Sequence, residues 1–139
     1  VLGLFPSVDA VVMAAAVSDY RPKAQAPQKI KKEQTIDSVA LERTEDILRR
    51  LGEIKGGQIL VGFAAETQNL VEHARAKLEQ KNLDLIVAND LTAAHAGFAS
   101  ETNQVTILWP DGRIESLPLQ EKELVAGEVW DRVESLWRG

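Results

Sequence analysis

An apolar run that breaks into small and then polar residues, near the start of the chain, constrains the fold most strongly. Residues 9–15 read Asp-Ala-Val-Val-Met-Ala-Ala, and Ser18-Asp-Tyr-Arg-Pro22 follows closely. A short, continuous, valine-rich run predicts a fully buried strand of a parallel sheet over residues 9–15. Polar groups at the carboxyl end of such a strand are typical of ligand sites in α/β proteins. Because the clustered lysines of Lys29-Ile-Lys-Lys32 come next, the pattern predicts an anionic ligand.

Later apolar runs extend this sheet. Pro110-Asp-Gly112 is flanked by two short strand patterns and predicts a hairpin over residues 104–117. Residues 17–35 hold two prolines and five lysines or arginines, and we expect them to form a long, mobile, lysine-rich flap. Residues 91–103 are also predicted to be a loop. Three further strands are predicted over residues 36–43, 58–63 and 83–88.

Helical patterns separate these strands. Thr44 is predicted to cap a short helix that carries Glu45 and Asp46 in its first turn and ends near Gly52. A second helix is predicted over residues 67–80, or from two residues later because Asn69 and Glu72 have capping-box spacing. A third is predicted over residues 121–137. The second helix is expected to bury Leu70, Val71, Ala74 and Leu78, and the third Val129, Trp130, Val133, Leu136 and Trp137.

The order of elements predicts an α/β domain with a largely parallel, right-handed sheet. Small residues stand at three strand ends, over residues 14–16, 62–64 and 88–90, where they would let a ligand approach the backbone. A length of 139 residues with 45% apolar residues suits a single domain.

Composition excludes several classes of function. The chain has no cysteine, so a disulfide, a thiolate zinc site and a cysteine nucleophile are excluded. A net charge of -5 argues against nucleic-acid binding, and no apolar run is long enough to cross a membrane. With no secretory segment apparent, we expect a cytoplasmic protein. His73 and His95 lie far apart in the sequence and in no metal-ligand spacing, which favours surface or loop positions and no protein-built metal site.

The cations are the remaining candidates for chemistry, because the chain has neither a P-loop nor a Gly-x-Gly-x-x-Gly fingerprint. Lysines on the flap could close over a polyphosphate, or could simply keep a surface loop solvated. Lys77 and Lys81 share a helical face with the apolar stripe, so they are predicted to point inward or along the sheet edge, unless they only snorkel and complement the helix C-terminus. Asp19 could bind a ribose, a base amino group or magnesium, or could cap a turn.

Four segments in order resemble the phosphopantothenoylcysteine synthetase family, the phosphopantothenate–cysteine ligase domain of bacterial bifunctional coenzyme A biosynthesis flavoproteins. The resemblance runs from about residue 9 to the end of the chain. It implies a three-layer Rossmann-like (ribokinase-like) fold, mostly parallel with a C-terminal hairpin. The segments are Ala14-Ala-Ala-Val-Ser-Asp-Tyr-Arg-Pro22, Lys29-Ile-Lys-Lys32, Val61-Gly-Phe-Ala-Ala-Glu-Thr67 and Lys81-Asn-Leu-Asp-Leu-Ile-Val-Ala-Asn-Asp90.

The resemblance implies a CTP-dependent ligase. In the family the carboxylate of 4'-phosphopantothenate is activated by a nucleoside triphosphate, which is CTP in most bacteria and gives an acyl-cytidylate, and cysteine then displaces CMP. Mg2+ would be carried by the nucleotide phosphates, FMN would belong only to a fused upstream domain, and the chain would form a homodimer. Lys29 is the expected catalytic residue at the reacting phosphate. The expected nucleotide-binding residues are Met13, Ala14, Ala15, Asp19, Lys29, Glu45, Asp46, Ile47, Leu48, Phe63, Lys77 and Lys81.

The sequence differs from the family pattern at its N-terminal end. Family members begin with a strand, a glycine turn and an Asn-x-Ser-Ser-Gly-like segment, none of which is present before residue 9. We therefore expect the chain to be the C-terminal part of a ligase domain that lacks at least one core strand. We also expect these 139 residues alone to bind CTP weakly and to catalyse poorly.

Two other readings stay open. The chain could be a non-catalytic dimerisation fragment that pairs through the hairpin of residues 104–117, in which case it would dimerise without a thermal shift from CTP. It could also be a Rossmann-like NAD(P)-binding oxidoreductase, which a comparison of CTP with NADH in a thermal-shift experiment would reveal.

Overall fold

The computed structural model describes residues 1–29, 31, 37–90 and 101–138, and the chain divides into two units. The first unit comprises Val1–Ala14 and Ile47–Gly139, and the second comprises Ala15–Asp46. The predicted flap of residues 17–35 falls within the second unit, and its residues 30 and 32–35 lie outside the described part.

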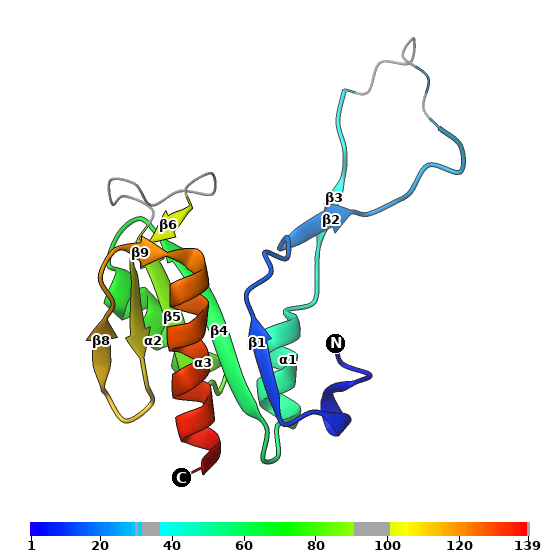
Figure 1. Ribbon diagram of the computed structural model, residues 1–139. Helices are drawn as coiled ribbons and strands as arrows, with labels where there is room; N and C mark the ends of the chain where they lie inside the picture. The colour runs from blue at the N-terminus through cyan, green and yellow to red at the C-terminus, as the bar shows by residue number, and fades with distance from the viewer. Residues whose placement is uncertain (30, 32–36, 91–100, 139) are drawn as a thin grey trace. The chain divides into compact units, whose positions relative to one another are not determined.

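The first unit is built on a five-stranded sheet of order β1-β4-β5-β7-β8 (Figure 1). Three strands, β1 (Ala10–Met13), β4 (Ile59–Glu66) and β5 (Leu85–Asp90), run parallel. The strands β7 (Val105–Leu108) and β8 (Ile114–Ser116) form the predicted antiparallel hairpin. The predicted α/β fold with a C-terminal hairpin is thus confirmed, with a sheet that is mixed and not wholly parallel.

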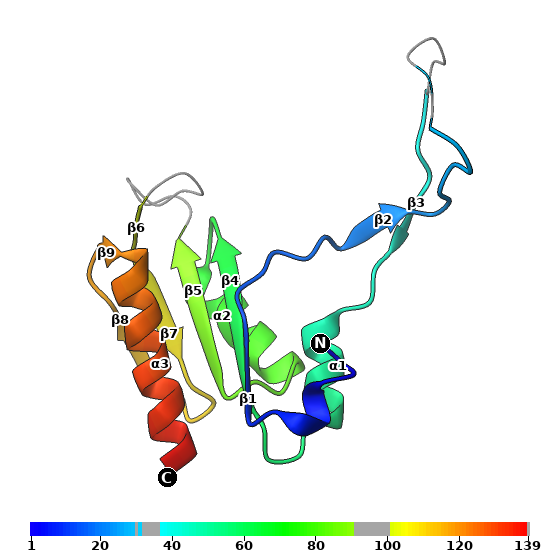
Figure 2. The same ribbon diagram turned by 45° about the vertical axis from the view of Figure 1, so that its right-hand side comes forward.

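Helices cover both faces of this sheet and make three layers (Figures 1 and 2). The helices α1 (Ile47–Ile54) and α2 (Leu70–Gln80) lie on one face, and α3 (Lys122–Arg138) lies on the other. Each face has its own apolar core, because side chains alternate between the faces along each strand. A short 3-10 helix, η1 (Phe5–Ser7), was not predicted, and its Phe5 is buried in the core on the α1 and α2 side.

The strands depart from the predicted bounds at both ends of the sheet. β1 is shorter than residues 9–15 and is not fully buried, since it is an edge strand whose Val12 is 40% exposed. β4 and β5 instead run three and two residues beyond the predicted ends of their strands, at Glu66 and Asp90. The strand predicted over residues 36–43 is confirmed only for β3 (Leu41–Arg43), and residue 36 is not described.

One helix start was predicted wrongly, and another lies at the later of its two predicted positions. α1 begins at Ile47, after Glu45 and Asp46, and ends at Ile54. The hydroxyl of Thr44 does not cap it, because it donates to the carbonyl oxygen of Ser18 at 2.5 Å. α2 begins at Leu70, as the later of the two predicted starts allows, but its N-cap Asn69 makes no side-chain capping bond.

Three residues expected in the apolar stripes are exposed. Val71 lies outside the buried face of α2, and Trp130 and Trp137 lie outside that of α3. The face of α3 that packs on the sheet is formed by Val125, Val129 and Val133, with Leu136 partly buried beside them. Trp130 follows Val129 by one position and Trp137 follows Leu136 by one position, which turns each tryptophan about 100° further around the helix and away from the centre of this face.

The second unit contains a two-stranded ribbon where part of an unstructured loop was predicted. β2 (Tyr20–Pro22) pairs antiparallel with β3, and the Arg21 Nε lies 2.8 Å from the Glu42 Oε1. In the first unit, β6 (Thr102–Asn103) and β9 (Gln120–Glu121) form a similar short antiparallel pair. β6 lies at the end of the predicted loop of residues 91–103, and β9 directly precedes α3. Residues 91–100 of that loop lie outside the described residues.

Arg132 anchors α3 to the edge strand β8. Its Nη2 lies 2.6 Å from the Glu115 Oε1, its Nε bonds the Oε2, and its Nη1 donates to the Glu128 carbonyl oxygen. The hydrogen bond from Arg132, acting against burial, lowers the pKa of Glu115 below its ordinary value of 4.5. A bidentate guanidinium–carboxylate pair is stronger than an ordinary surface ion pair.

We expect Glu115→Gln to lower the free energy of unfolding by about 1 kcal/mol at neutral pH. Because the folded-state pKa of Glu115 is lowered, its ionic contribution is complete above the ordinary pKa of 4.5 and is lost as the pH falls through the folded value. Urea unfolding of both proteins at neutral and acidic pH measures this. A difference that persists unchanged in acid would contradict the ionic origin of the effect.

Candidate functional site

The carboxyl ends of the three parallel strands are stepped. Met13 of β1 is level with Gly62 of β4, and Gly62 is level with Ile86 of β5. Among the described residues, β1 pairs with β4 only as far as Gly62, whereas β5 follows β4 to Glu66. The last four residues of β4 therefore have a neighbouring strand on one side only. An α/β sheet binds its ligands at the carboxyl ends of its strands, so this step is the candidate site.

Gly62 makes room for a helix at this point. A Cβ on Gly62 would lie 2.7 Å from the Cδ1 of Leu83 and 3.0 Å from the Cδ2 of Leu48. The prediction that small residues here let a ligand reach the backbone is therefore wrong for this face, where leucine side chains fill the space. Leu48 is buried, so it can meet a ligand only through its backbone or by shaping the start of α1.

Phe63 lies on the opposite face of β4. It follows Val61, which belongs to the core under α3, and it is one of the exposed large apolar residues. Its ring is thus available for stacking against a planar group near the end of β1. The structure places Phe63 next along the strand to Gly62, which pairs with Met13.

A carboxylate holds one of the predicted lysines. The Nζ of Lys77 donates to the Oε1 of Glu66 at 2.5 Å, and the Nδ1 of His73 lies 3.2 Å from the Oε2. The Glu66 side chain is only 14% exposed, and that of Lys77 is 43% exposed. Burial raises the pKa of Glu66, but the hydrogen bonds from Lys77 and His73 outweigh it and leave the pKa lowered. The carboxylate is therefore ionised at neutral pH.

Sequence reasoning missed Glu66 and assigned His73 to an ordinary surface position. The signal was present, because His73 and Lys77 are four residues apart on α2 and so share a face. Glu66 stands at the end of a strand directly before that helix. Lys77 points along the sheet edge, one of the two predicted orientations, and reaches the carboxyl end of β4.

Lys81 lies against α1 through its backbone. A Cβ on Gly52 would come within 1.9 Å of the Lys81 carbonyl oxygen, so the helix and the end of α2 are in direct contact. The Nδ2 of Asn82 donates to the Gly52 carbonyl oxygen at 3.0 Å, and Asn82 has a left-handed backbone with φ of 51°. These contacts fix the backbone of Lys81 against α1.

The other predicted residues belong to the second unit or to its boundary. Asp19 accepts a backbone hydrogen bond from Thr44 at 2.9 Å through its carbonyl oxygen. Lys29, Asp19 and Glu45 are exposed. Of the predicted site residues, Met13, Ala14, Ile47, Leu48, Phe63, Lys77 and Lys81 belong to the first unit, whereas Ala15, Asp19, Lys29, Glu45 and Asp46 belong to the second. Phe63 lies on the α3 face of the sheet, and Leu48 lies on the opposite face. That these residues form one nucleotide site stays a prediction.

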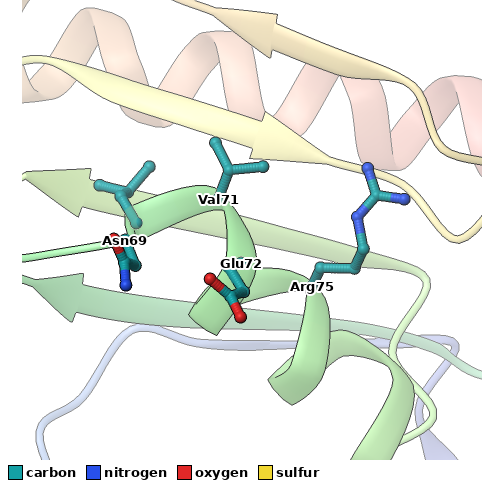
Figure 3. Close-up of a pocket in the computed structure, with 5 residues that line it drawn as sticks. Asn69, Val71, Glu72 and Arg75 are labelled. Carbon is teal, nitrogen blue, oxygen red and sulfur yellow. The ribbon is translucent and has the colours of Figure 1, made fainter.

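Two hollows adjoin α2. The larger, of about 580 Å3, is lined by Asn69, Leu70, Val71, Glu72 and Arg75. Figure 3 shows Val71 and Arg75 pointing toward the neighbouring strand of the hairpin, while Glu72 points away from it. None of the predicted nucleotide-binding residues lines this hollow.

The smaller hollow, of about 160 Å3, lies at the carboxyl end of the sheet. Ala88 and Asp90 of β5 line it together with Gln104, Thr106 and Leu70. Within the described ranges there is no group of three or more histidine or acidic side chains that could hold a metal ion. No helix of the described part of the chain has the length and apolar character needed to span a membrane.

The fold and the stepped edge define an α/β domain of the class that binds ligands where parallel strands end. The chain belongs to the family of the DNA/pantothenate metabolism flavoprotein C-terminal domain, whose pattern matches residues 1–136. The resemblance inferred from the sequence motifs is thereby confirmed.

Among curated proteins, the chain is 48% identical over 136 residues to the coenzyme A biosynthesis bifunctional protein CoaBC of Bacillus subtilis. That match covers 98% of this chain and 34% of the relative. The CoaBC protein of Escherichia coli K12 is 42% identical over 123 residues, covering 86% of this chain and 30% of the relative. The chain thus spans about a third of the length of these relatives.

Solved structures agree with this assignment. The crystal structure of the C-terminal domain of a CoaBC protein has a TM-score of 0.77 and 40% identity, covering 99% of this chain and 59% of that one. A DNA/pantothenate metabolism flavoprotein from Streptococcus pneumoniae has a TM-score of 0.73 at 21% identity, covering 94% and 65%, and supports the fold alone.

Proposed function

We propose that this chain is the nucleotide-binding part of a CTP-dependent phosphopantothenate–cysteine ligase of coenzyme A biosynthesis. The names of the CoaBC relatives support the pathway, and the four sequence motifs support the ligase half of such a protein. The observation that carries the proposal is Lys77, whose ammonium group is held at the carboxyl end of β4. A fixed cation at this edge suits a polyphosphate.

The proposed reaction makes and breaks bonds at phosphorus and carbon. A carboxylate oxygen of 4'-phosphopantothenate attacks the α-phosphorus of CTP, and pyrophosphate leaves with the electrons of the broken P–O bond. The cysteine amine then attacks the acyl carbon, CMP leaves, and the amine loses a proton. Such transfers need alignment and charge neutralisation more than a protein nucleophile, which agrees with a chain without cysteine.

The residues would divide this work. Lys29, from the predicted flap, would neutralise charge at the reacting phosphate, and Lys77 and Lys81 would attract the nucleotide. Backbone groups of Met13, Ala14 and Ala15 would line it, and the exposed ring of Phe63 would lie against it. Asp19 and residues 45–48 would complete the nucleotide contacts.

The proposed function also implies Mg2+ and further binding partners. Mg2+ usually keeps waters and binds substrate phosphates, with few protein ligands. We infer that the nucleotide phosphates would carry the ion. The proposed partners are CTP, 4'-phosphopantothenate, cysteine and a second copy of the chain.

Nucleotide binding by the intact protein tests the proposal. We expect CTP with Mg2+ to raise the melting temperature more than ATP or NADH does, and we expect CMP to form only when 4'-phosphopantothenate is added. Lys29→Ala should lower the rate of CMP formation by roughly a hundredfold, because it removes a charge from the reacting phosphate. Isothermal titration and single-turnover assays measure these effects.

Lys122→Ala is the matched control for this lysine substitution, because Lys122 lies exposed at the start of α3. It should bind CTP and turn over like the unsubstituted protein. Stabilisation by NADH but not by CTP would overturn the proposal in favour of an oxidoreductase. A dimer that responds to no nucleotide would overturn it in favour of a dimerisation role.

A further inference from the structure

Glu66 occupies a position that the proposed nucleotide chemistry leaves unexplained. It is the last residue of β4, and its cross-strand neighbour on β5 is Asp90. A carboxylate beside a phosphate site repels the ligand unless it is neutralised or has another task. Glu66 is largely buried and remains ionised because Lys77 and His73 bond it.

The two oxygens of this carboxylate have different partners. The Oε1 accepts from the Lys77 Nζ at 2.5 Å, and the Oε2 lies 3.2 Å from the His73 Nδ1. Both partners come from one face of α2, four residues apart, so the carboxylate ties the end of β4 to two turns of that helix. His73 limits the ways in which the carboxylate can turn.

Lys77 gains a defined position from this contact. A lysine side chain has four rotatable bonds and loses much rotamer freedom when it is fixed. Its ammonium group has three N–H donors, and Glu66 accepts one of them. The Lys77 side chain is 43% exposed, so its ammonium group is also accessible from solvent.

We propose that Glu66 is a positioning residue that holds the Lys77 ammonium group at the carboxyl end of β4, oriented for the phosphates of the nucleotide. The inference rests on the proposed function and adds a residue to its site. Glu66 acts through Lys77 and does not itself touch the nucleotide. The entropy of fixing the lysine is met during folding instead of during binding, which is the general benefit of a preorganised site.

A double-mutant cycle on CTP binding by the intact protein tests this role. We expect Glu66→Gln to weaken CTP binding roughly tenfold, because the neutral amide holds the ammonium group less firmly. Lys77→Met should weaken it at least as much. In the Lys77→Met background, Glu66→Gln should have no further effect, because the group that it positions is gone.

Matched variants separate positioning from general damage. Glu66→Asp keeps the charge and should restore at least half of the lost binding free energy. Glu115→Gln also removes a carboxylate from a cation, but at β8, and should leave the CTP dissociation constant unchanged. Melting temperatures of all variants are measured without nucleotide. If Glu66→Gln does not fold, Glu66→Asp compared with Glu66→Asp in the Lys77→Met background completes the cycle.

Different results of these experiments would overturn the positioning role of Glu66 and the proposed nucleotide-binding function. If the unsubstituted protein does not bind CTP, the proposed function fails. If it binds CTP and Lys77→Met weakens binding, but Glu66→Gln leaves it unchanged or strengthens it, the positioning role is overturned while the function stands. Additive effects of the two substitutions would also overturn it, because they would mean that Glu66 acts independently of Lys77.

Discussion

Gly52→Ala is expected to lower the free energy of unfolding by about 3 kcal/mol, near the upper end of the usual cost of overpacking. The new methyl group would lie 1.9 Å from the Lys81 carbonyl oxygen and 2.8 Å from its carbon. Both atoms belong to backbone, so no side-chain rotation can relieve the contact. Chemical denaturation monitored by circular dichroism measures the loss.

Several bonds prevent the turn after α2 from moving away. The Nζ of Lys55 donates to the Asn82 carbonyl oxygen at 2.9 Å and to both carboxylate oxygens of Asp84. The Oδ2 of Asp84 also accepts from the Leu60 backbone nitrogen at 2.7 Å. The turn is therefore tied to β4, and α1 has to shift instead.

Gly127→Ala is the control for this prediction. Gly127 is exposed in α3, and a Cβ there meets nothing within 4 Å. Alanine should stabilise the helix by up to about 1 kcal/mol, because glycine has the greater backbone freedom when unfolded. Equal effects of the two substitutions would refute close packing as the reason for Gly52.

The second large effect is expected from Phe5→Ala, with a loss of about 3–5 kcal/mol in the free energy of unfolding. Phe5 is only 2% exposed and packs in the core that lies between the sheet, α1 and α2. Removing its ring leaves a cavity that the η1 segment can close only by moving. The change is measured by urea unfolding followed by circular dichroism.

Leu4→Ala provides a control within the same segment. Leu4 is 68% exposed and adjoins Phe5, so its loss should change stability by less than about 0.5 kcal/mol. A cost for Phe5→Ala that is no greater than that for Leu4→Ala would mean that the segment before β1 does not contribute to the core.

Local patterns predicted much of the fold because they report local physics. The turn at Pro110-Asp-Gly112 forms as expected, with Gly112 at φ of 91° in a region that favours glycine. Short apolar runs predicted β4 and β5 because strands buried on both faces carry continuous apolar sequence. Their order along the chain was sufficient to predict the α/β class.

Tertiary contacts explain the failures. Thr44 has the residue type of a helix cap, but its hydroxyl donates a hydrogen bond to the carbonyl oxygen of Ser18, which is distant in sequence. Trp130 and Trp137 are apolar residues at a helical interval, yet the geometry of α3 turns Val125 to the sheet instead. Phe5 stands in a segment too short to show a period, so its burial left no pattern in the sequence.

The sequence motifs were sufficient to select candidate residues for the site, but not to predict which side chains contact one another there. Lys77 follows from the resemblance, whereas its bond to Glu66 depends on how β4 and α2 meet in space. The same holds for Gly62, whose small size suggested access for a ligand but accommodates Leu48 and Leu83. Residue type alone does not distinguish a gap that is open from one that is filled.

The division of the chain into two units also gives each unit its own optical probe. The three tryptophans all belong to the first unit, and the single tyrosine, Tyr20, belongs to the second. Trp109 is buried under the guanidinium group of Arg113, 4.9 Å from the ring centroid, whereas Tyr20 is exposed on the ribbon. Tryptophan emission therefore reports on the sheet, and the tyrosine signal reports on the ribbon, without any added label.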